Sequence, residues 1–407
     1  MGETAHHSLR SVVLIKDTPF SAWDYQRLGI ELLKKNGLSV EIWDVTQVVH
    51  PRVPYTDHPL PAPMIPPRVF SDKNKLFRSL DRLDPSGSAI VLLFTLTNRS
   101  YGLYRAISKR SLYYIVLFLN VVPTSACRSI REKSLVSFKD FLKKFFLYPK
   151  LRFVESALDN FILRWYRVLG VKAANLCLLG GKECEKGIPF PIDGKTRLFW
   201  GHAFDYDIFL NKKDNMEKPD RPFAVFIDQY LPFQDVSYNN DTQVCDPDRY
   251  YPSLCRFFTR LEEQLKCRVV IAAHPRVPDI ARYSVFFEGR EVLPGDTAGL
   301  IQQSDLVIVH ASTATNFAVL FNKPVLFITT NELNNSNVKP YIDSVADELG
   351  KELLNVAEPV VLDPSAVYSV DPAKYQCFKE NYIKTARSRD DYLWQLVADY
   401  LKGIQRS

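Results

Sequence analysis

The stretch Phe223-Ala-Val-Phe-Ile-Asp228-Gln229 decides the fold of this chain. Its apolar run is short and unbroken, which is typical of a strand buried on both faces of a parallel sheet. Two similar runs follow, Arg268-Val-Val-Ile-Ala-Ala273 and Leu306-Val-Ile-Val309, and amphipathic stretches separate the three. Strands that alternate with helices in this way predict an α/β domain with a parallel sheet.

The same alternation extends in both directions. Further strands are predicted at residues 11–17, 38–44, 89–95, 113–119, 174–179 and 324–328, and helices at 23–35, 249–266, 297–303, 314–321 and 374–403. A polar, proline-bounded stretch at 211–222 is the best linker candidate. We therefore predict two Rossmann-like α/β domains, residues 1–215 and 216–407, with a deep cleft between them. The second domain would end in the long C-terminal helix.

Composition excludes several classes of protein. The 407 residues are 46% hydrophobic and carry a formal charge of +6, which argues against a disordered chain and against a nucleic-acid binder. Seven cysteines form no CxxC pair, which argues against a disulfide framework or a zinc site and for a reducing compartment. The N-terminus lacks a signal-peptide core, and the longest apolar run, at 113–123, falls short of the roughly 20 residues of a spanning helix. We expect a cytoplasmic protein.

Polar residues follow the first two strands of the second half. Asp228 would be costly to bury without partners, so it is either a catalytic carboxylate or an acceptor for backbone and tyrosine groups. His274 and Arg276, separated by the rigid Pro275, could together neutralise a phosphate. A single histidine at a strand end is more often structural. Ligands of parallel α/β sheets bind at the carboxyl ends of strands, which makes these residues candidates.

The third strand of the second half ends in His310 and leads directly into a predicted helix. Ser312, Thr313 and Thr315 lie where the free N–H groups of that helix begin, which suits them to hold a phosphate. An ordinary Ser/Thr helix cap would have the same sequence.

Weaker candidates lie elsewhere near the predicted cleft. Asp17 and Asp24, after the first strand, could contact an acceptor or could cap a helix. An Asp-x-Asp pair before the linker could hold a divalent metal, but such pairs arise easily in loops, and we expect no metal site. Asp235, shortly after Asp228, is one more candidate carboxylate. These candidates are Asp17, Asp24, His202, Asp205, Asp207 and Asp235.

Residues 128–152 contain eight Lys or Arg and only two acidic residues. Leu135, Phe138, Leu142 and Phe145 recur there at helical spacing, which predicts a basic amphipathic helix. Such helices bind anionic membrane surfaces. The alternative is a helix that packs on the core and exposes its basic face to water.

The ordered set Asp228-Gln229, His274-Pro275 and Ser312-Thr313 resembles the donor-binding half of bacterial surface-polysaccharide glycosyltransferases. It is most similar to the retaining β-Kdo transferases, over residues 222–330. No Walker loop, GxGxxG, GxSxG or HExxH sequence points to another enzyme class.

The resemblance implies a GT-B fold and a CMP-activated ulosonic or nonulosonic acid as donor, with a growing oligosaccharide or lipid-linked glycan as acceptor. His274 and Ser312-Thr313 would hold the CMP moiety, with Gln229, Pro275, Arg276, His310 and Thr315 beside them, and no metal or other cofactor would be required. Asp228 would be the nucleophile of a double displacement.

Two alternatives stay open. One is an inverting glycosyltransferase or polymerase that uses another donor, such as CMP-sialic acid or a UDP- or CDP-linked group. The other is a non-catalytic protein that binds glycans or nucleotides in an assembly complex. In each case the expected location is the cytoplasm, at the inner face of the membrane if residues 128–152 bind lipid.

Overall fold

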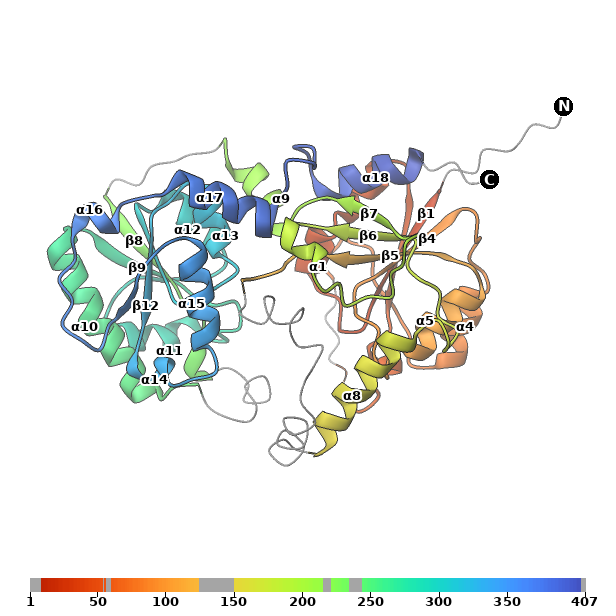
Figure 1. Cartoon of the computed structure of the whole chain (residues 1–407), viewed down its shortest axis with the longest axis horizontal. Helices are drawn as coiled ribbons and strands as arrows, with labels where there is room; N and C mark the ends of the chain where they lie inside the picture. Colours follow the sequence, from red (N-terminus) through yellow and green to blue (C-terminus); the bar gives the residue numbers. More distant parts are fainter. Residues whose placement is uncertain are drawn as a thin grey trace. The chain divides into compact units, whose positions relative to one another are not determined.

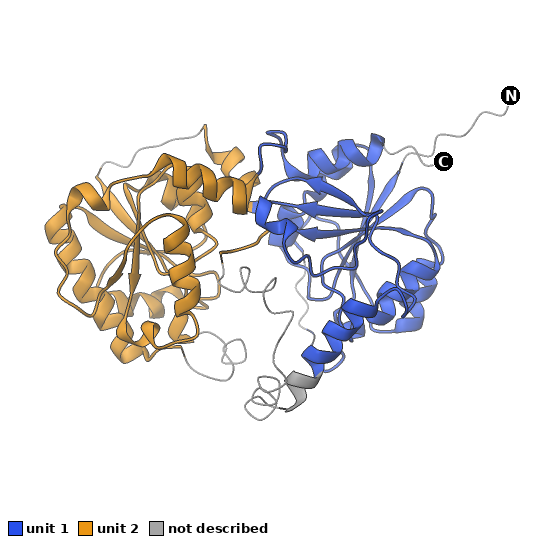
Figure 2. Ribbon diagram, in the orientation of Figure 1, with its two compact units in different colours: residues 1–119, 132–204, 385–407 blue, residues 120–131, 205–384 orange. Residues whose placement is uncertain are grey.

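The structure is a computed structural model that describes residues 9–53, 55, 60–123, 150–214, 221–233 and 244–403. The chain divides into two compact units (Figure 2). Unit 1 comprises residues 1–119, 132–204 and 385–407, and unit 2 comprises residues 120–131 and 205–384. Each unit contains one parallel sheet with helices packed around it (Figure 1), which confirms the predicted two Rossmann-like folds.

Unit 1 contains a seven-stranded sheet in the order β3-β2-β1-β4-β5-β6-β7. The chain proceeds from β1 outward to β3 and then returns to the other side of β1 to form β4, so the switch point lies between β1 and β4. The strands are β1 Ser11–Lys16, β2 Ser39–Asp44, β3 Arg68–Val69, β4 Ser88–Leu92, β5 Tyr113–Phe118, β6 Leu176–Leu179 and β7 Arg197–Trp200. The helices are α1 Ala22–Arg27, α2 Ile30–Lys35, α3 Thr46–Val49, α4 Lys73–Leu80, α5 Tyr101–Lys109, α8 Lys150–Trp165, the 3-10 turn η2 Lys182–Glu185 and α18 Leu393–Gly403.

Unit 2 repeats this topology in a six-stranded sheet, β10-β9-β8-β11-β12-β13, with its switch point between β8 and β11. The strands are β8 Phe223–Ile227, β9 Arg268–Ala272, β10 Val292–Leu293, β11 Leu306–Val309, β12 Val325–Thr329 and β13 Leu353–Asn355. The α-helices are α9 Phe204–Lys212, α10 Pro247–Leu265, α11 Ile280–Ser284, α12 Thr297–Gln303, α13 Thr315–Leu320, α14 Asn331–Asn334, α15 Lys339–Glu348, α16 Pro364–Val367 and α17 Pro372–Phe378. Short helical turns are η3 Leu231–Phe233, η5 Val285–Phe287 and the π-helical η6 Lys379–Ile383.

The predicted first helix at 23–35 is two helices, because the chain turns at Gly29 between α1 and α2. Gly29 has φ +56°, and a Cβ there would lie 2.7 Å from the side chain of Trp394. Only a residue without a side chain fits this left-handed, closely packed position.

The prediction of one long C-terminal helix at 374–403 is wrong. The segment forms α17, η6 and, after residues 384–392, the separate helix α18. Helix α18 buries Leu393, Trp394 and Val397 in the hydrophobic core of unit 1, and the indole Nε1 of Trp394 donates to the Arg27 carbonyl at 3.0 Å. The last 23 residues, 385–407, therefore belong to unit 1 and not to the second domain.

The division between the units also differs from the predicted boundary at 215/216. Helix α9, apart from its first residue, belongs to unit 2, which begins again at residue 205. Phe209 of α9 packs on Phe321 with ring centroids 5.2 Å apart, and Asp205 accepts a hydrogen bond of 2.8 Å from the Asn316 amide. These contacts attach α9 to α13 and its following turn.

The cysteines in the described part of the chain are free thiols, and all but Cys377 are buried. None of the helices that the structure describes combines the length and the apolar composition needed to cross a bilayer.

Candidate functional site

Three strand ends meet at the carboxyl edge of the unit 2 sheet, because β8 pairs with β9 on one side and with β11 on the other. Asp228 and Gln229 follow β8, His274 follows β9, and residues 310–313 follow β11. The structure thus brings together the three motifs predicted to form one site, and it places them around the switch point, where parallel α/β sheets bind ligands.

Asp228 is buried, with 3% of its surface exposed. Its Oδ1 accepts from the Tyr230 N–H at 3.1 Å and its Oδ2 from the Tyr283 hydroxyl at 2.9 Å. The backbone N–H groups of His274 and Gln229 also donate to this carboxylate. Burial raises the pKa of Asp228 to about 6, although the donated hydrogen bonds oppose this shift. These contacts are those of an acceptor for backbone and tyrosine groups, one of the two alternatives predicted for Asp228.

Tyr283 and Tyr251, which the sequence reasoning missed, continue this network. The two hydroxyls lie 2.7 Å apart. Because Tyr283 donates to a carboxylate, its oxygen is free to accept the proton of Tyr251, so the hydrogen bonds run from Tyr251 through Tyr283 to Asp228. Tyr251 lies on α10 and Tyr283 on α11, far from Asp228 in sequence, and neither follows a strand, so no local signal marked them.

Gln229 connects the two strands that flank the switch point. Its Oε1 accepts from the Ala311 N–H at 3.1 Å, and its Nε2 donates to the Ala311 carbonyl. The amide thus pairs with both backbone groups of one residue beyond β11. A Gln side chain supplies the donor and the acceptor that this pairing needs, and Asp or Glu would supply acceptors only.

His274 is half-buried, and its Nδ1 accepts from the Arg276 N–H at 3.1 Å. Burial and the positive charge of Arg276 lower the pKa of His274, so the imidazole is neutral at pH 7. With Nδ1 accepting, the single ring proton lies on Nε2, which makes this nitrogen a hydrogen-bond donor. The ring lies parallel to that of Tyr230, with centroids 6.5 Å apart. Pro275 and Arg276 are exposed beside it.

His310 differs from its predicted role in donor binding. It is fully buried, its Nδ1 donates to the Ile328 carbonyl at 2.7 Å, and its Nε2 accepts from the Tyr250 hydroxyl at 2.8 Å. Burial lowers the pKa of His310 to about 4, so it is neutral. Both ring nitrogens are used within the core, which gives His310 a packing role.

The Ser/Thr motif divides between surface and core. Ser312 is half-buried and accepts from the Ala314 N–H at 3.2 Å, whereas Thr313 is exposed. Thr315 begins α13, is fully buried, and its hydroxyl has no hydrogen-bond partner among the described residues. Thr315 is thus directed into the protein, and Ser312 and Thr313 are the members of the motif that can face a ligand.

Most of the weaker candidates have structural roles. Asp24 forms a capping box with Ser21 at the start of α1 and an ion pair of 2.5 Å with Lys16. His202 is fully buried, and its Nε2 lies 2.9 Å from the Asp391 carbonyl. Asp205 binds Asn316, and Asp207 lies with it in the first turn of α9. Asp235 and residues 128–149 lie outside the described part of the chain.

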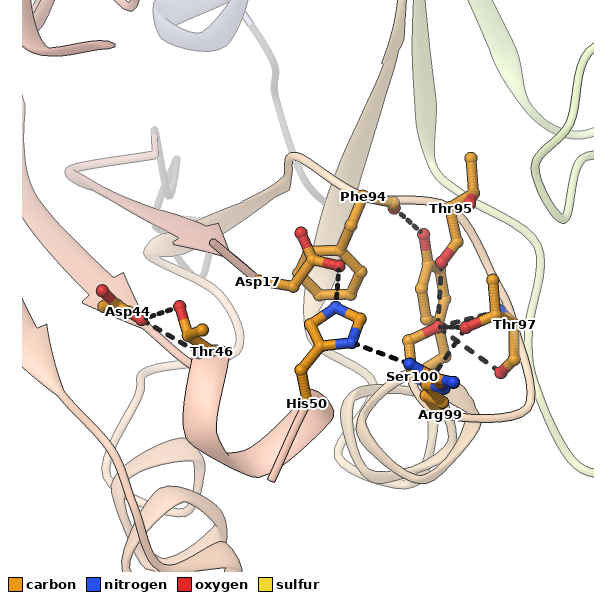
Figure 3. A network of polar contacts seen from close by, with 10 residues as sticks. Asp17, Asp44, Thr46, His50, Phe94, Thr95, Thr97, Arg99 and Ser100 are labelled. Carbon is orange, nitrogen blue, oxygen red and sulfur yellow. Dashed lines mark hydrogen bonds and ion pairs between the residues drawn. The ribbon is translucent and has the colours of Figure 1, made fainter. Parts of the chain in front are cut away.

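Asp17 is the remaining candidate, and the structure pairs it with His50, which the sequence reasoning missed. The Asp17 Oδ2 lies 3.0 Å from the His50 Nε2, and the His50 Nδ1 lies 3.4 Å from the Arg99 Nη1 (Figure 3). The three residues follow β1, β2 with α3, and β4, at the carboxyl edge of the unit 1 sheet. Among the described residues, no group of three or more His, Cys, Asp or Glu side chains could hold a metal ion.

No family model matches the sequence, and no curated protein matches it. Solved structures of similar fold include a variant of the wall teichoic acid polymerase TagF, with a TM-score of 0.50, 11% identity, and coverage of 96% of this chain and 88% of that chain. The UDP-GlcNAc 2-epimerase from Methanocaldococcus jannaschii matches with a TM-score of 0.49, 11% identity, and coverage of 97% and 100%. The glycotransferase of kitacinnamycin matches with a TM-score of 0.47, 11% identity, and coverage of 97% and 99%.

Identities this low bear on the fold alone. Together with the two parallel sheets, the likeness to TagF defines the chain as a protein of the two-Rossmann GT-B fold.

Proposed function

We propose that the protein is a glycosyltransferase that binds a nucleotide-sugar donor at the carboxyl edge of the unit 2 sheet. The observation that carries this proposal is the meeting of Gln229, His274 and Ser312 around the β8–β11 switch point. The GT-B fold agrees with it, and the structurally similar TagF is a polymerase of a wall polymer. We further propose that the acceptor is a bacterial surface glycan, either free or lipid-linked.

We propose a CMP-activated ulosonic or nonulosonic acid, such as Kdo, as donor. The neutral His274 would donate from Nε2 to an oxygen of the phosphate, and the Ser312 and Thr313 hydroxyls could donate to the same group. The Arg276 guanidinium, exposed two residues after His274, would offset the charge of the leaving CMP. This donor chemistry rests on the motif resemblance described above.

In the retaining route, the Asp228 carboxylate attacks the anomeric carbon and the bond to the phosphate oxygen breaks, so CMP leaves with the electron pair. The acceptor oxygen then attacks the same carbon, releases the carboxylate and loses its proton to a base. Asp228 must be ionised for the first step, so this route requires a pH above its raised pKa of about 6.

One observation favours an inverting route as second candidate. Asp228 already accepts hydrogen bonds from Tyr230, Tyr283, Gln229 and His274, which fits a residue that orders the loops after β8 and β9. In that route the acceptor displaces the nucleotide directly, and Asp228 positions His274. The anomeric configuration of the product distinguishes the two routes.

We also propose that the protein works in the cytoplasm and contacts the membrane from its inner face. Helix α8 directly continues the basic segment 128–152, and it exposes Leu158, Phe161 and Trp165 with 44%, 52% and 49% of their surfaces accessible. Their spacing of three and four residues places these side chains on one face of the helix. An exposed apolar face beside a basic segment fits an anionic lipid surface.

The proposed function is tested by incubating the protein with CMP-Kdo, CMP-sialic acid and UDP-GlcNAc and measuring nucleotide release and covalent sugar adducts. We expect CMP release from one of the CMP donors and its loss in His274→Ala. An adduct on Asp228 supports the retaining route. If no donor is bound or hydrolysed, the proposal is wrong.

A further inference from the structure

We propose that the ring of Tyr230 is the surface on which the nucleobase of the donor stacks. The assignment rests on the proposed glycosyltransferase function and deepens it, because it places the base of the nucleotide beside His274, the residue that would hold its phosphate. It is carried by the backbone conformation of Tyr230 and by the position of its ring, both within unit 2.

The backbone of Tyr230 is left-handed, with φ +55°. A residue with a side chain adopts this conformation at a cost in free energy, and such residues cluster at functional sites. In the described part of the chain, the other non-glycine residues with a positive φ each lie at the C-terminal end of a helix or helical turn, where the left-handed conformation is common. These residues are Ser111, Lys266, Glu288 and Asn322. Tyr230 instead lies between β8 and η3, so no helix end accounts for its conformation.

Hydrogen bonds on both sides hold the backbone of Tyr230. Its N–H donates to the Asp228 Oδ1 at 3.1 Å, and its carbonyl accepts from the Phe233 N–H at 3.1 Å. The first contact anchors Tyr230 to the buried carboxylate after β8, and the second closes the turn η3. The backbone that carries the ring is therefore fixed before any ligand binds, which reduces the entropy lost on binding.

Two other aromatic rings support the ring of Tyr230. Its centroid lies 5.0 Å from that of Phe233 and 5.3 Å from that of Tyr283. The planes of these rings are inclined to Tyr230 by 40° and 68°, so neither stacks flat on it. Tyr230 is half-buried, which leaves part of the residue accessible to a ligand.

The hydroxyl of Tyr230 differs from those of the neighbouring tyrosines. The hydroxyls of Tyr250, Tyr251 and Tyr283 are all hydrogen-bonded within the core of unit 2. The Tyr230 hydroxyl makes no hydrogen bond to any residue that the structure describes. The side chain of Tyr230 therefore contributes its ring to the site, and the ring is the part that stacking requires.

The relation of Tyr230 to His274 favours a nucleobase as the stacked group. The two ring centroids are 6.5 Å apart and the planes differ by only 7°, so a flat ring that stacks on Tyr230 is also parallel to the imidazole. In a nucleoside monophosphate, one ribose separates the base from the phosphate that His274 would hold. The sugar on the other side of the phosphate is a saturated ring without a π face. Because every base has a π face, stacking of this kind binds different bases alike.

The test measures the binding of CMP, UMP and ribose 5-phosphate to the full chain by calorimetry. Ribose 5-phosphate keeps the ribose and the phosphate and lacks the base. The variants are Tyr230→Ala, Tyr230→Gly and Tyr230→Phe, and the urea midpoint of each reports its folding. Tyr368→Ala is the matched control, because Tyr368 is 37% exposed in unit 2 but hydrogen-bonds Cys267, which precedes β9 at the opposite edge of the sheet.

We expect Tyr230→Ala and Tyr230→Gly to weaken the binding of CMP and UMP about tenfold, the effect of one lost base–aromatic stack, and to leave the affinity for ribose 5-phosphate within about twofold of the wild type. Tyr230→Phe keeps a ring, and like Tyr368→Ala it should bind all three ligands within about twofold of the wild type. Because glycine fits the left-handed backbone, Tyr230→Gly should have a higher urea midpoint than Tyr230→Ala. Stacking should also lower the ultraviolet absorbance of CMP when it binds the wild type.

The assignment is overturned if folded Tyr230→Ala and Tyr230→Gly bind CMP as the wild type does, or if they lose as much affinity for ribose 5-phosphate as for CMP. A raised KM for CMP-Kdo with unchanged CMP affinity would place the ring against the sugar and would also overturn it. If neither truncated variant folds, an unchanged absorbance of CMP on the wild type overturns it. If the wild type binds none of the three ligands, it is the proposed function that fails, so the behaviour of the wild type distinguishes the two failures.

Discussion

The Tyr283 hydroxyl donates a hydrogen bond of 2.9 Å to Asp228 Oδ2, and this contact ties α11 to the end of β8. It joins a side chain 55 residues away to the carboxylate at the switch point of the unit 2 sheet. Because Gln229 and Tyr230 donate from the loop after β8 and His274 donates from the loop after β9, Asp228 joins these two backbone segments to α11.

Replacing Tyr283 by Phe removes this donor and leaves its ring in place. We expect a loss of about 1–2 kcal/mol in the free energy of unfolding. The pKa of Asp228 should rise further, because a hydrogen bond to its charged form is lost. The acid limb of nucleotide release that depends on Asp228 should therefore move to higher pH. Tyr101→Phe, which loses a phenol contact of 2.7 Å to the Leu169 carbonyl, should leave that limb unchanged.

Asp228 gives the stability of the protein a defined dependence on pH. Its pKa in the folded chain is about 6, above the ordinary value of 3.8 that it has in the unfolded chain. Between these two pH values the folded chain therefore binds more protons at Asp228 than the unfolded chain does. The contribution of Asp228 to stability is thus complete below pH 3.8 and is lost as the pH rises through 6. At about 1.36 kcal/mol for each pH unit, the loss is about 3 kcal/mol.

Urea unfolding of the wild type and Asp228→Asn between pH 3.5 and about 7 measures this loss, since the variant cannot titrate at this position. As the pH rises over this range, the unfolding free energy of the wild type should fall by about 3 kcal/mol relative to that of Asp228→Asn. A difference that is constant over the whole range would contradict the buried, raised-pKa state of Asp228.

His274→Ala should weaken CMP binding about tenfold, the effect of one lost hydrogen bond to a charged phosphate. His274→Gln keeps a donor and should lose less. The pKa of His274 is lowered, so the imidazole is neutral above pH 7 and CMP affinity should be flat between pH 7 and about 8.5. Isothermal titration calorimetry measures the CMP affinity of the wild type and of both variants, and the dependence of the wild-type affinity on pH. Unchanged affinity in His274→Ala would remove this residue from the site.

The central strands of both sheets could be predicted from sequence, because most of them are unbroken apolar runs buried on both faces; β2, which carries the exposed Glu41, is an exception. The strands β3, β7, β10 and β13 were missed. They are two to four residues long, and β7 begins with the exposed Arg197. The long C-terminal helix was predicted wrongly because amphipathic periodicity continues through residues 384–392, where the chain passes from unit 2 to unit 1.

At the site, residues that end strands could be predicted, and residues that reach them from other elements could not. Asp228 and His274 were found because each interrupts an apolar run. His50 was missed because its pairing with Asp17 depends on the parallel register of β1 and β2, which the sequence does not encode locally. His310 was predicted to bind the donor because it follows a strand. Its burial beneath Tyr250 depends on the packing of α10, which the local sequence does not show.

The apolar face of α8 should bind anionic membranes. Phe161→Ser combined with Trp165→Ser should reduce flotation with vesicles that contain phosphatidylglycerol, because the exposed apolar area is lost. Val361→Ser is the control, since Val361 is 92% exposed but lies in unit 2. Equal flotation of the wild type and the double variant would exclude this face as the membrane contact.

A crystal soaked with CMP shows directly whether the donor nucleotide binds at the β8–β11 switch point of the unit 2 sheet. We predict density for the phosphate within hydrogen-bond distance of the His274 Nε2 and beside Ser312. Density at another place with this edge of the sheet empty, or no binding of CMP, UDP or CDP at all, would contradict the proposed donor site.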